Sequence, residues 1–369
     1  MENGKKILMI GNSELVIFKF RRELVERLVS EGYEVYTAYP VTEFGNGEIA
    51  EKLGCHFVEL EISSHGTNPF ADLALIRRLK KLMRNIRPDV VLSYTIKPNL
   101  YGAVAAAKYR IPIIANVTGL GTAVEQAGFL QKVTVALYRY AFPKTRHVFF
   151  QNTENEQFFA SRHIADGKRE IIPGSGVNLE RFKPLEYPKG EINFLFMARI
   201  IKEKGIDQYL DAAKAIRAKY PETRFHVIGL CDDEHYKQVL ADCEAKDIIK
   251  YHGLQNDVRP FHQNSACTVH PTYYPEGLSN VLLESCASAR PIITTDRSGC
   301  REVVEDGVNG FVCRQQDSAD LTAKIEQFLA LPWEARRDMG LAGRAKVERE
   351  FDRNIVINKY IEQIEKAVK

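Results

Sequence analysis

The stretch that most constrains the fold of this chain is 264–299, NSACTVHPTYYPEGLSNVLLESCASARPIITTDRSG. The apolar run at 266–270 predicts a buried parallel strand, and the apolar spacing over 278–289 predicts a helix. A proline ends that helix, and 292–295 predict the next strand. A strand, loop, helix and strand in this order indicate a parallel α/β sheet. Ligands of such sheets bind at the carboxyl ends of the strands, against helix N-termini.

Two glutamates, Glu276 and Glu284, stand eight residues apart in this stretch. On a helix this spacing gives about 12 Å of rise and roughly 80° of rotation, so both could line one side of a nucleotide sugar. The amides of 277–280 would then meet a diphosphate between them. Two glutamates at this spacing often arise by chance in a Glu-rich chain. A glutamate before glycine, in a loop after a buried strand, has no evident packing role, which favours the functional interpretation.

The segment PEGLSNVLLE at 275–284 resembles the E-x7-E signature of retaining, nucleotide-sugar-dependent glycosyltransferases of the GT-B fold, family 4 type. The resemblance covers nearly the whole chain, and this motif is its most specific part. It implies an α/β protein with two Rossmann-like, doubly wound parallel-sheet domains that face a cleft. We expect an acceptor-binding, membrane-facing domain at 1–184, a nucleotide-sugar-binding domain at 185–352, and a helix at 353–369 that returns to the first domain.

Arg199 and Lys204 resemble the diphosphate-binding pair of this family. Departure of a nucleoside diphosphate develops negative charge, which fixed cations stabilise. Ordinary basic residues at the start of a surface helix would give the same pattern, and Lys202 lies between them. The resemblance implies catalytic roles for Arg199, Lys204 and Glu276. The residues expected to bind the donor are Glu284, Gly277, Leu278, Ser279, Asn280, Gly229, Gly253 and Gly11.

The first half holds a second group of candidates. Gly11 follows the first predicted strand and would let backbone approach a ligand, but no complete GxGxxG indicates a nicotinamide cofactor. The segments 18–21, 68–70 and 119–121, and Pro98-Asn99 with Gly102, look like the N-domain pattern of bacterial transferases that extend polyprenyl-diphosphate-linked sugars. These include N-acetylgalactosaminyl and galactosyl transferases. Many members of the wider family carry a histidine near the position of Thr118, so no catalytic histidine is carried over. The residues expected to bind the acceptor are Lys19, Arg21, Lys97, Thr118, Gly119 and Gly121.

The cysteines, the apolar runs and the charge of the chain limit the compartments and partners that can be expected. Seven scattered cysteines without CxxC pairs fit free thiols in a reducing cytoplasm. No apolar run reaches the roughly 18 residues of a membrane-spanning helix, and the short apolar run near the N-terminus is typical of a strand rather than a signal peptide. The net charge is only +3, yet 70–150 contain 13 basic and three acidic residues.

That basic segment has two interpretations. It could be a solvated helix face, or it could dock on the anionic inner surface of the plasma membrane, where each basic residue contributes about 1 kcal/mol. Nucleic acid is not expected as a partner, because the chain is not strongly basic overall and shows no recognition motif.

The resemblance implies retaining transfer of a hexose, N-acetylgalactosamine by preference, from a UDP-sugar to a polyprenyl-diphosphate-linked sugar. In the route proposed for the family, the leaving phosphate takes the acceptor proton. Because no D-x-D motif stands at a strand end, no metal is expected. The resemblance implies no cofactor besides the donor substrate, a UDP-sugar. Two alternatives stay open. A sugar-nucleotide epimerase of the same fold would consume UDP-sugar without an acceptor, and a non-catalytic nucleotide-sugar-binding protein would show no turnover.

Overall fold

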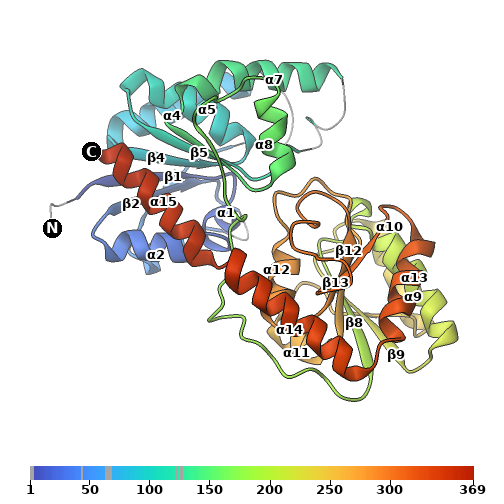
Figure 1. Cartoon of the computed structure of the whole chain (residues 1–369). Helices are drawn as coiled ribbons and strands as arrows, with labels where there is room; N and C mark the ends of the chain where they lie inside the picture. Colours follow the sequence, from blue (N-terminus) through green and yellow to red (C-terminus); the bar gives the residue numbers. More distant parts are fainter. Residues whose placement is uncertain (1–3, 43–44, 63–68, 122–123, 125–127) are drawn as a thin grey trace. The chain divides into compact units, whose positions relative to one another are not determined.

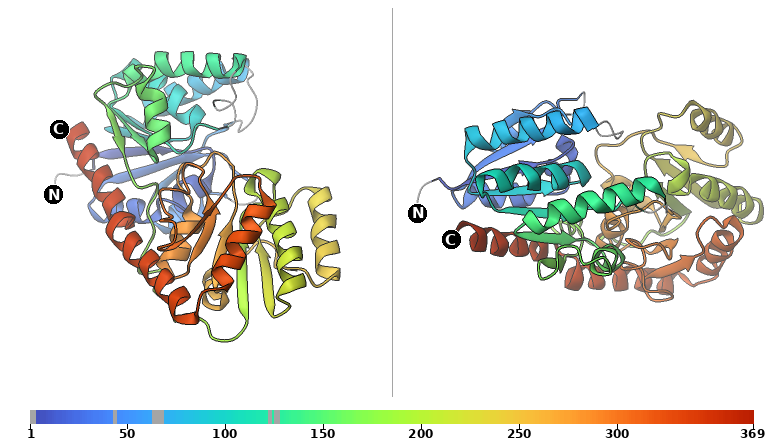
Figure 2. Two further views of the ribbon diagram at one scale, coloured as in Figure 1. Left: turned by 45° about the vertical axis from the view of Figure 1, so that its right-hand side comes forward. Right: turned by 90° about the horizontal axis from the view of Figure 1, so that it is seen from above.

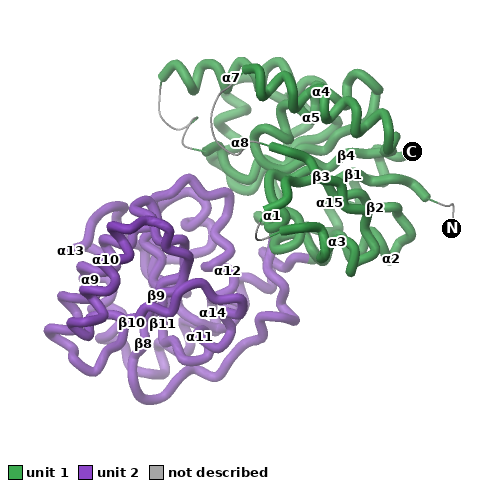
Figure 3. The backbone as a smooth tube through the Cα atoms, turned by 180° about the vertical axis from the view of Figure 1, so that it is seen from behind, with its two compact units in different colours: residues 1–175, 354–369 green, residues 176–353 purple. Residues whose placement is uncertain are grey.

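The computed structural model describes residues 4–42, 45–62, 69–121, 124 and 128–369. The chain forms two compact units (Figure 3). Unit 1 comprises Met1–Ser175 and Asn354–Lys369, and unit 2 comprises Gly176–Arg353. Each unit has a parallel sheet covered by helices on both faces (Figures 1 and 2). The predicted architecture of two doubly wound domains is therefore confirmed.

The seven-stranded sheet of unit 1 has the strand order β3-β2-β1-β4-β5-β6-β7. The order reverses between β1 and β4, so the carboxyl ends of these two neighbouring strands mark the switch point of the unit. The elements of unit 1 are β1 (Lys6–Ile10), α1 (Glu14–Phe18), α2 (Arg22–Ser30), β2 (Glu34–Tyr39), α3 (Glu48–Lys52), β3 (His56–Glu59), α4 (Pro69–Ile86), β4 (Val90–Tyr94), α5 (Ile96–Tyr109), β5 (Ile113–Val117), α7 (Phe129–Ala141), η1 (Phe142–Lys144), β6 (His147–Phe150), α8 (Thr153–Ala160), β7 (Arg169–Ile171) and α15 (Arg353–Val368).

Helices α4, α5 and α7 form one layer over a face of this sheet (Figures 1 and 2). α4 buries Leu75, Leu79 and Met83, which recur every four residues, so its opposite side faces outward. α5 is rich in small residues and lies close to the sheet. A Cβ atom on Gly102 would stand 3.2 Å from Cδ1 of Ile113.

The other face of the unit 1 sheet is covered by α2 and by the C-terminal helix α15, although α15 follows an element of unit 2 in sequence. α15 buries Ile357, Tyr360 and Ile364 in the same cluster as the strands. The Tyr360 hydroxyl accepts a hydrogen bond of 2.5 Å from Nδ2 of Asn116 on β5. The helix therefore completes the core of unit 1.

The six-stranded sheet of unit 2 has the order β10-β9-β8-β11-β12-β13, with its switch point between β8 and β11. Helices α9, α10 and α13 cover one face, and α11, α12 and α14 the other. The elements are β8 (Ile192–Met197), η2 (Lys202–Lys204), α9 (Ile206–Lys219), β9 (Thr223–Ile228), α10 (Glu234–Ala245), β10 (Lys250–Tyr251), α11 (Arg259–Asn264), β11 (Cys267–His270), α12 (Asn280–Ala287), β12 (Ile292–Thr295), β13 (Gly310–Cys313), α13 (Ser318–Leu329) and α14 (Trp333–Glu350).

The first boundary between the units lies at residue 176, earlier than the expected 184/185, and the second lies within one residue of the expected one. The reason for the shift is that residues after 176 pack on unit 2. Val177 and Phe182 join the cluster around α12. The fully buried Arg290 donates hydrogen bonds to the carbonyl oxygens of Leu185 and Glu186, at 3.2 and 2.7 Å.

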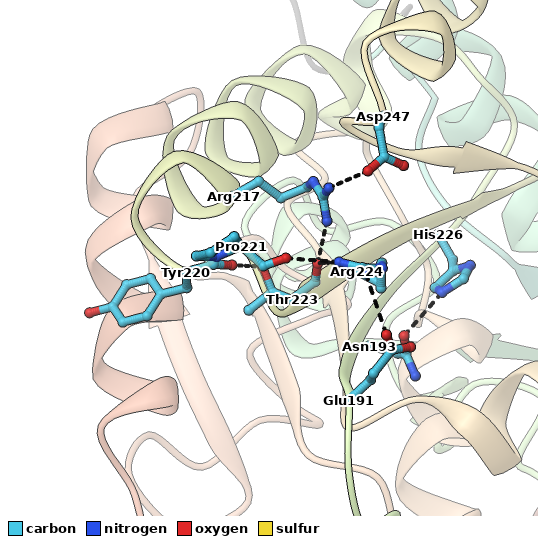
Figure 4. A network of polar contacts seen from close by, with 9 residues as sticks. All are labelled: Glu191, Asn193, Arg217, Tyr220, Pro221, Thr223, Arg224, His226 and Asp247. Carbon is cyan, nitrogen blue, oxygen red and sulfur yellow. Dashed lines mark hydrogen bonds and ion pairs between the residues drawn. The ribbon is translucent and has the colours of Figure 1, made fainter.

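A polar network ties the amino-terminal half of β9 to its neighbours (Figure 4). Arg217 of α9 donates to the carbonyl oxygen of Thr223 at 2.6 Å and to Oδ2 of Asp247 at 2.5 Å. The His226 ring lies 3.2 Å from Oδ1 of Asn193. These contacts fix β8, β9 and α9 relative to one another and leave the carboxyl ends of the strands to the candidate site.

Candidate active site

The candidate site of unit 2 lies at the carboxyl ends of β8 and β11, the two strands at its switch point. Arg199 stands two residues after β8, and its side chain is exposed. The loop 271–279 follows β11 and leads into α12. The fold therefore brings Arg199, Lys204 and Glu276 to the same edge of one sheet, where ligands of such sheets bind.

Backbone contacts hold the two loops of this site together. The amide of Tyr273 donates to the carbonyl oxygen of Glu203 at 3.0 Å, and the Thr272 hydroxyl donates to the same oxygen at 3.3 Å. Gly205 has φ 79°, and a Cβ atom there would stand 2.2 Å from the carbonyl oxygen of Pro271. Only glycine permits both this conformation and this approach. As a result, the short helix η2 presents Lys204 to the Glu276 loop.

Lys204 and Glu276 form an ion pair, with side chains 12% and 19% exposed. The Lys204 ammonium also lies 4.6 Å from the centroid of the Tyr274 ring, which is a cation–π distance. The two predicted catalytic side chains are thus in direct contact, although 72 residues separate them. Tyr274 is a further residue of this site that sequence reasoning did not single out. The sequence did hold a signal for Tyr274, because two tyrosines stand between the buried strand and Glu276.

The backbone after Glu276 packs against the loop that follows β12. A Cβ atom on Gly299 would lie 2.8 Å from Cβ of Glu276. The Gly299 carbonyl oxygen accepts a hydrogen bond of 2.8 Å from the Ser279 amide, and the Gly299 amide donates to Oε2 of Glu302 at 2.7 Å. The Ser279 amide, expected to face the donor diphosphate, is therefore engaged by this loop in the structure.

Burial keeps two groups beneath the ion pair uncharged. His270, at the end of β11, is 1% exposed, and burial followed by the nearby Lys204 lowers its pKa to about 3. Cys300 is fully buried, and burial together with Glu276 raises the pKa of its thiol to about 12. Neither His270 nor Cys300 therefore adds a charge beside Lys204 and Glu276.

The helix after Glu276 begins later than predicted. α12 spans Asn280–Ala287 with Ser279 as its N-cap, whereas the apolar spacing predicted a helix from 278 to 289. Leu278 is 6% exposed and packs in the α12 cluster from a non-helical backbone. Glu276 therefore precedes the helix by four residues, and the helical estimate of its separation from Glu284 was wrong. Glu284 itself lies on α12 and is half-buried.

Gly229 and Gly253, two further residues expected to bind the donor, stand where the backbone conformation or a close contact favours glycine. Gly229 lies so close to β8 that a Cβ atom would stand 1.6 Å from the carbonyl oxygen of Ala198. Its amide donates to the carbonyl oxygen of Gly253 at 3.0 Å, and Gly253 has φ 66°. The adjacent Leu254 is 56% exposed. Gly229 thus follows β9, the strand next to β8, and Gly253 follows the edge strand β10 at the same end of the sheet.

The predicted residues of unit 1 differ in their exposure. Gly11 is buried after β1, and a Cβ atom there would lie 3.3 Å from Cγ1 of Ile17. Lys19 is exposed, but Arg21 is only 5% exposed. The Arg21 guanidinium stacks on the Tyr94 ring at 3.9 Å and donates to a backbone carbonyl at 2.6 Å. The expectation that Arg21 presents its charge to an acceptor therefore does not fit the structure, because its charge is directed into the protein.

The remaining predicted acceptor residues follow β4 and β5. Lys97 lies in the first turn of α5 and pairs with Asp72 at 3.1 Å. Thr118, Gly119 and Gly121 are partly exposed in the loop after β5, and both glycines have positive φ angles, 147° and 70°. Asn68, part of one of the motifs in the family resemblance, lies outside the described residues.

Within the described residues, no group of three or more histidine, cysteine, aspartate or glutamate side chains is arranged to hold a metal ion. Among the same residues, no helix is long and apolar enough to cross a bilayer.

Two protein-family models match this chain. Residues 178–346 match the model of glycosyl transferases group 1, and residues 6–152 match that of glycosyl transferase 4-like domains. The chain is 31% identical to the putative glycosyltransferase EpsD of Bacillus subtilis, over 92% of this chain and 91% of that protein. The chain belongs to the glycosyltransferases of the GT-B fold that carry these two domains.

One further relative and one solved structure are similar to this chain over nearly its whole length. N,N'-diacetylbacillosaminyl-diphospho-undecaprenol alpha-1,3-N-acetylgalactosaminyltransferase of Campylobacter jejuni is 25% identical, over 99% of both chains. The solved structure of Anabaena Alr3699/HepE in complex with UDP and glucose has a TM-score of 0.78 and 16% identity, covering 97% of this chain and 98% of that chain. The similarity to the HepE structure shows that the two proteins share a fold.

Proposed function

We propose that this glycosyltransferase moves a hexose, N-acetylgalactosamine by preference, from a UDP-sugar to a polyprenyl-diphosphate-linked sugar, with retention of configuration and without a metal. The observation that carries the proposal is the contact between Lys204 and Glu276 at the switch point of unit 2. A cation for a diphosphate and a carboxylate for sugar hydroxyls stand side by side there. The Campylobacter jejuni relative, similar over its whole length, supports the choice of donor sugar and lipid-linked acceptor.

In this proposal the donor lies across the carboxyl edge of the unit 2 sheet. The Arg199 guanidinium and the Lys204 ammonium bind the diphosphate, Glu276 accepts hydrogen bonds from sugar hydroxyls, and Glu284 accepts them from the ribose. Binding replaces the Lys204–Glu276 pair by one contact from each residue to the donor. Both charges then keep a partner, so the site avoids the cost of leaving a half-buried charge unpaired.

The chemical step breaks the bond between the anomeric carbon and the diphosphate oxygen and forms a bond from that carbon to the acceptor oxygen. The acceptor hydroxyl gives its proton to the departing phosphate on the same face of the sugar. Arg199 and Lys204 stabilise the negative charge that develops on the phosphate, which is the largest contribution a protein makes to such reactions. No protein side chain is required as a base in this route.

A lipid-linked acceptor implies work at a bilayer surface, and α4 and α7 offer a suitable face. Phe70 is 85% exposed and Phe129 is 83% exposed, whereas phenylalanine side chains are usually buried in a folded protein. We call this the α4–α7 face. Its exposed apolar residues are Phe70, Leu73, Phe129, Leu130, Val133 and Tyr140. Its exposed basic residues are Arg77, Lys81, Arg84, Lys132 and Arg139.

The two helices of this face belong to one layer of unit 1 (Figure 2). Apolar side chains can enter the interface between headgroups and acyl chains, while the basic residues pair with anionic lipids. We therefore place the enzyme at the cytoplasmic surface of the plasma membrane, attached peripherally, in the assembly of a cell-surface glycan.

The proposal is tested by a thermal-stabilisation screen over UDP-, GDP- and dTDP-sugars, followed by product analysis with polyprenyl-diphosphate sugars. We expect stabilisation by UDP-sugars, transfer only with a lipid-linked acceptor, an unchanged anomeric configuration in the product, and full activity in EDTA. Consumption of UDP-sugar at the same rate without an acceptor would instead indicate an epimerase. Stabilisation without turnover on any acceptor would indicate a non-catalytic binding protein.

A further inference from the structure

Lys204 has a second contact besides its ion pair with Glu276, and the proposed function does not use it. The Lys204 ammonium lies 4.6 Å from the centroid of the Tyr274 ring. Only 12% of the Lys204 side chain is exposed, so this cation–π contact is largely shielded from water. Such contacts are stronger when they are desolvated than when they lie at an exposed surface.

The Tyr274 ring is carried by a backbone that does not depend on the ion pair. The Tyr274 amide donates to the hydroxyl oxygen of Thr272 at 3.1 Å, and the Tyr274 carbonyl oxygen accepts from the Glu276 amide at 2.9 Å. Thr272 is fully buried, and its carbonyl oxygen accepts a hydrogen bond of 2.6 Å from the hydroxyl of Thr295 on β12. These backbone contacts hold the ring in place whether or not Lys204 is paired with Glu276.

Packing does not explain a large ring at position 274. The Tyr274 side chain is partly exposed, and the apolar clusters that the described residues of unit 2 form do not include it. A ring outside the core contributes little through the burial of apolar area. Its contact with the Lys204 ammonium is therefore the interaction that accounts for it.

A second group of the same three residue types stands at the other end of α9. Lys219 pairs with Glu326 at 2.8 Å, and its ammonium lies 5.4 Å from the centroid of the ring of Tyr220, which Figure 4 labels. The Lys219 side chain is 60% exposed, so water competes with both contacts. The cation–π contact is therefore weak at Tyr220 and stronger at Tyr274.

The proposed binding of the donor gives the contact at Tyr274 a task. Glu276 turns to the sugar hydroxyls, and Lys204 has to stay beside the diphosphate. A lysine side chain is flexible, and without a fixed partner its ammonium spreads over several positions. The Tyr274 ring is a partner of that ammonium which donor binding does not remove.

We propose that Tyr274 is a positioning residue, which keeps the Lys204 ammonium beside the leaving diphosphate after Glu276 has moved to the donor sugar. The inference rests on the proposed function, because it concerns the leaving group of that reaction. The negative charge on the leaving phosphate is largest in the transition state, so a displaced Lys204 lowers the rate more than the donor affinity. The aromatic ring is required for this role, and the hydroxyl is not.

Three variants test the ring. Tyr274→Leu removes it, Tyr274→Phe keeps it without the hydroxyl, and Tyr220→Leu is the matched control at the exposed lysine of the same helix. The assay follows transfer from UDP-N-acetylgalactosamine to a farnesyl-diphosphate-linked N-acetylhexosamine. We expect Tyr274→Leu to lower kcat about tenfold, the effect of one desolvated cation–π contact, with the KM for the donor changed by no more than about twofold.

Tyr274→Phe and Tyr220→Leu should match the wild type. Equal losses in Tyr274→Phe and Tyr274→Leu would show that the hydroxyl acts rather than the ring, and would overturn the inference. A melting temperature of Tyr274→Leu far below that of Tyr220→Leu would show a structural role and would overturn it as well.

A double-mutant cycle with Lys204→Met separates positioning from an independent effect. If the ring acts only through the Lys204 ammonium, Tyr274→Leu should cause no further loss of kcat in the Lys204→Met background. The same tenfold loss in both backgrounds would contradict the inference, because the ring would then act without Lys204.

The remaining outcomes distinguish this inference from the proposed function. A wild-type protein that transfers the sugar, together with an unchanged kcat in Tyr274→Leu, would overturn the role of Tyr274 alone. A wild-type protein that neither binds UDP nor transfers sugar from a UDP-sugar would instead refute the proposed function, and the role of Tyr274 with it.

Discussion

The two units share one strand order around their switch points but differ in the side chains that stand there. At the carboxyl ends of β8 and β11, unit 2 presents Lys204 and Glu276 as a partly exposed ion pair. At the carboxyl ends of β1 and β4, unit 1 buries the guanidinium of Arg21 against Tyr94 and holds Thr95 at φ 71°. A threonine with a positive φ is strained, and such strain is typical of functional segments.

This difference shows that the shared architecture does not assign the ligand. Unit 2 presents a partly exposed ion pair, whereas unit 1 directs its switch-point cation inward and exposes the α4–α7 face. Function is therefore carried by the side chains placed on the two similar sheets. Each of the following predictions asks whether the two units are divided in this way.

The largest effect should follow from Glu276→Ala. Loss of the carboxylate removes contacts to the donor sugar, and we expect kcat/KM to fall about a thousandfold, the upper range for one electrostatic contact in an active site. Binding of UDP, followed by calorimetry, should change little, because Arg199 and Lys204 are retained, whereas the melting temperature should fall because Lys204 loses its ion-pair partner. If the variant kept more than a tenth of the wild-type activity, Glu276 would not be the carboxylate that binds the donor sugar.

A somewhat smaller effect is expected for Lys204→Met. Loss of one cation from the leaving diphosphate should lower kcat about a hundredfold and weaken UDP binding. Lys202→Met is the matched control, because Lys202 lies in the same short helix but is exposed. Steady-state kinetics of both variants distinguish a specific role from a general loss of positive charge. Equal losses in the two variants would contradict the assignment.

The sequence predicted the placement of Arg199, Lys204 and Glu276 at one sheet edge better than it predicted the placement of Arg21. Glu276, Arg199 and Lys204 follow buried strands at recognisable spacings, and strand order then brings them together. The helix boundary failed because Gly277 and the N-cap Ser279 delay the first turn, which apolar spacing alone does not reveal. Arg21 failed because its partner Tyr94 is 73 residues away, and a stacking contact of this kind has no local signal.

The α4–α7 face should show a moderate effect. Replacing Arg77 and Lys81 by glutamine should weaken binding to vesicles of anionic phospholipid by about 2 kcal/mol, or roughly thirtyfold, at low salt. The control is the pair Arg22→Gln and Lys52→Gln, exposed basic residues on α2 and α3. Vesicle sedimentation measures both. Unchanged sedimentation of the Arg77 and Lys81 variant would exclude this face as the docking surface.

The smallest effect concerns acid stability and should be concentrated in unit 2. Burial and then the adjacent His252 lower the pKa of His226 to about 4, and the two rings lie 2.9 Å apart at their nearest nitrogens. His262 and His270, also in unit 2, have pKa values lowered to about 3 by burial. The unfolded chain, with histidine pKa values near 6.5, binds more protons below that pH. Stability is therefore present above pH 6.5 and is lost as the pH falls towards 4.

Replacement of His226 tests this directly. His226→Gln cannot take up the proton, so the loss of stability between pH 7 and pH 5 should be smaller than in the wild type by about 1–2 kcal/mol. His235→Gln is the control, because His235 is exposed on α10. Urea unfolding at the two pH values measures the difference, and hydrogen exchange assigns it to a unit. Acid opening of unit 1 before unit 2 would contradict the predicted asymmetry.

The most direct test of the donor site is a crystal structure of the protein soaked with UDP. We predict that the diphosphate lies within hydrogen-bonding distance of Arg199 and Lys204, that the ribose lies at Glu284, and that Lys204 has left Glu276. UDP bound away from these side chains, with the Lys204–Glu276 ion pair still intact, would contradict the account.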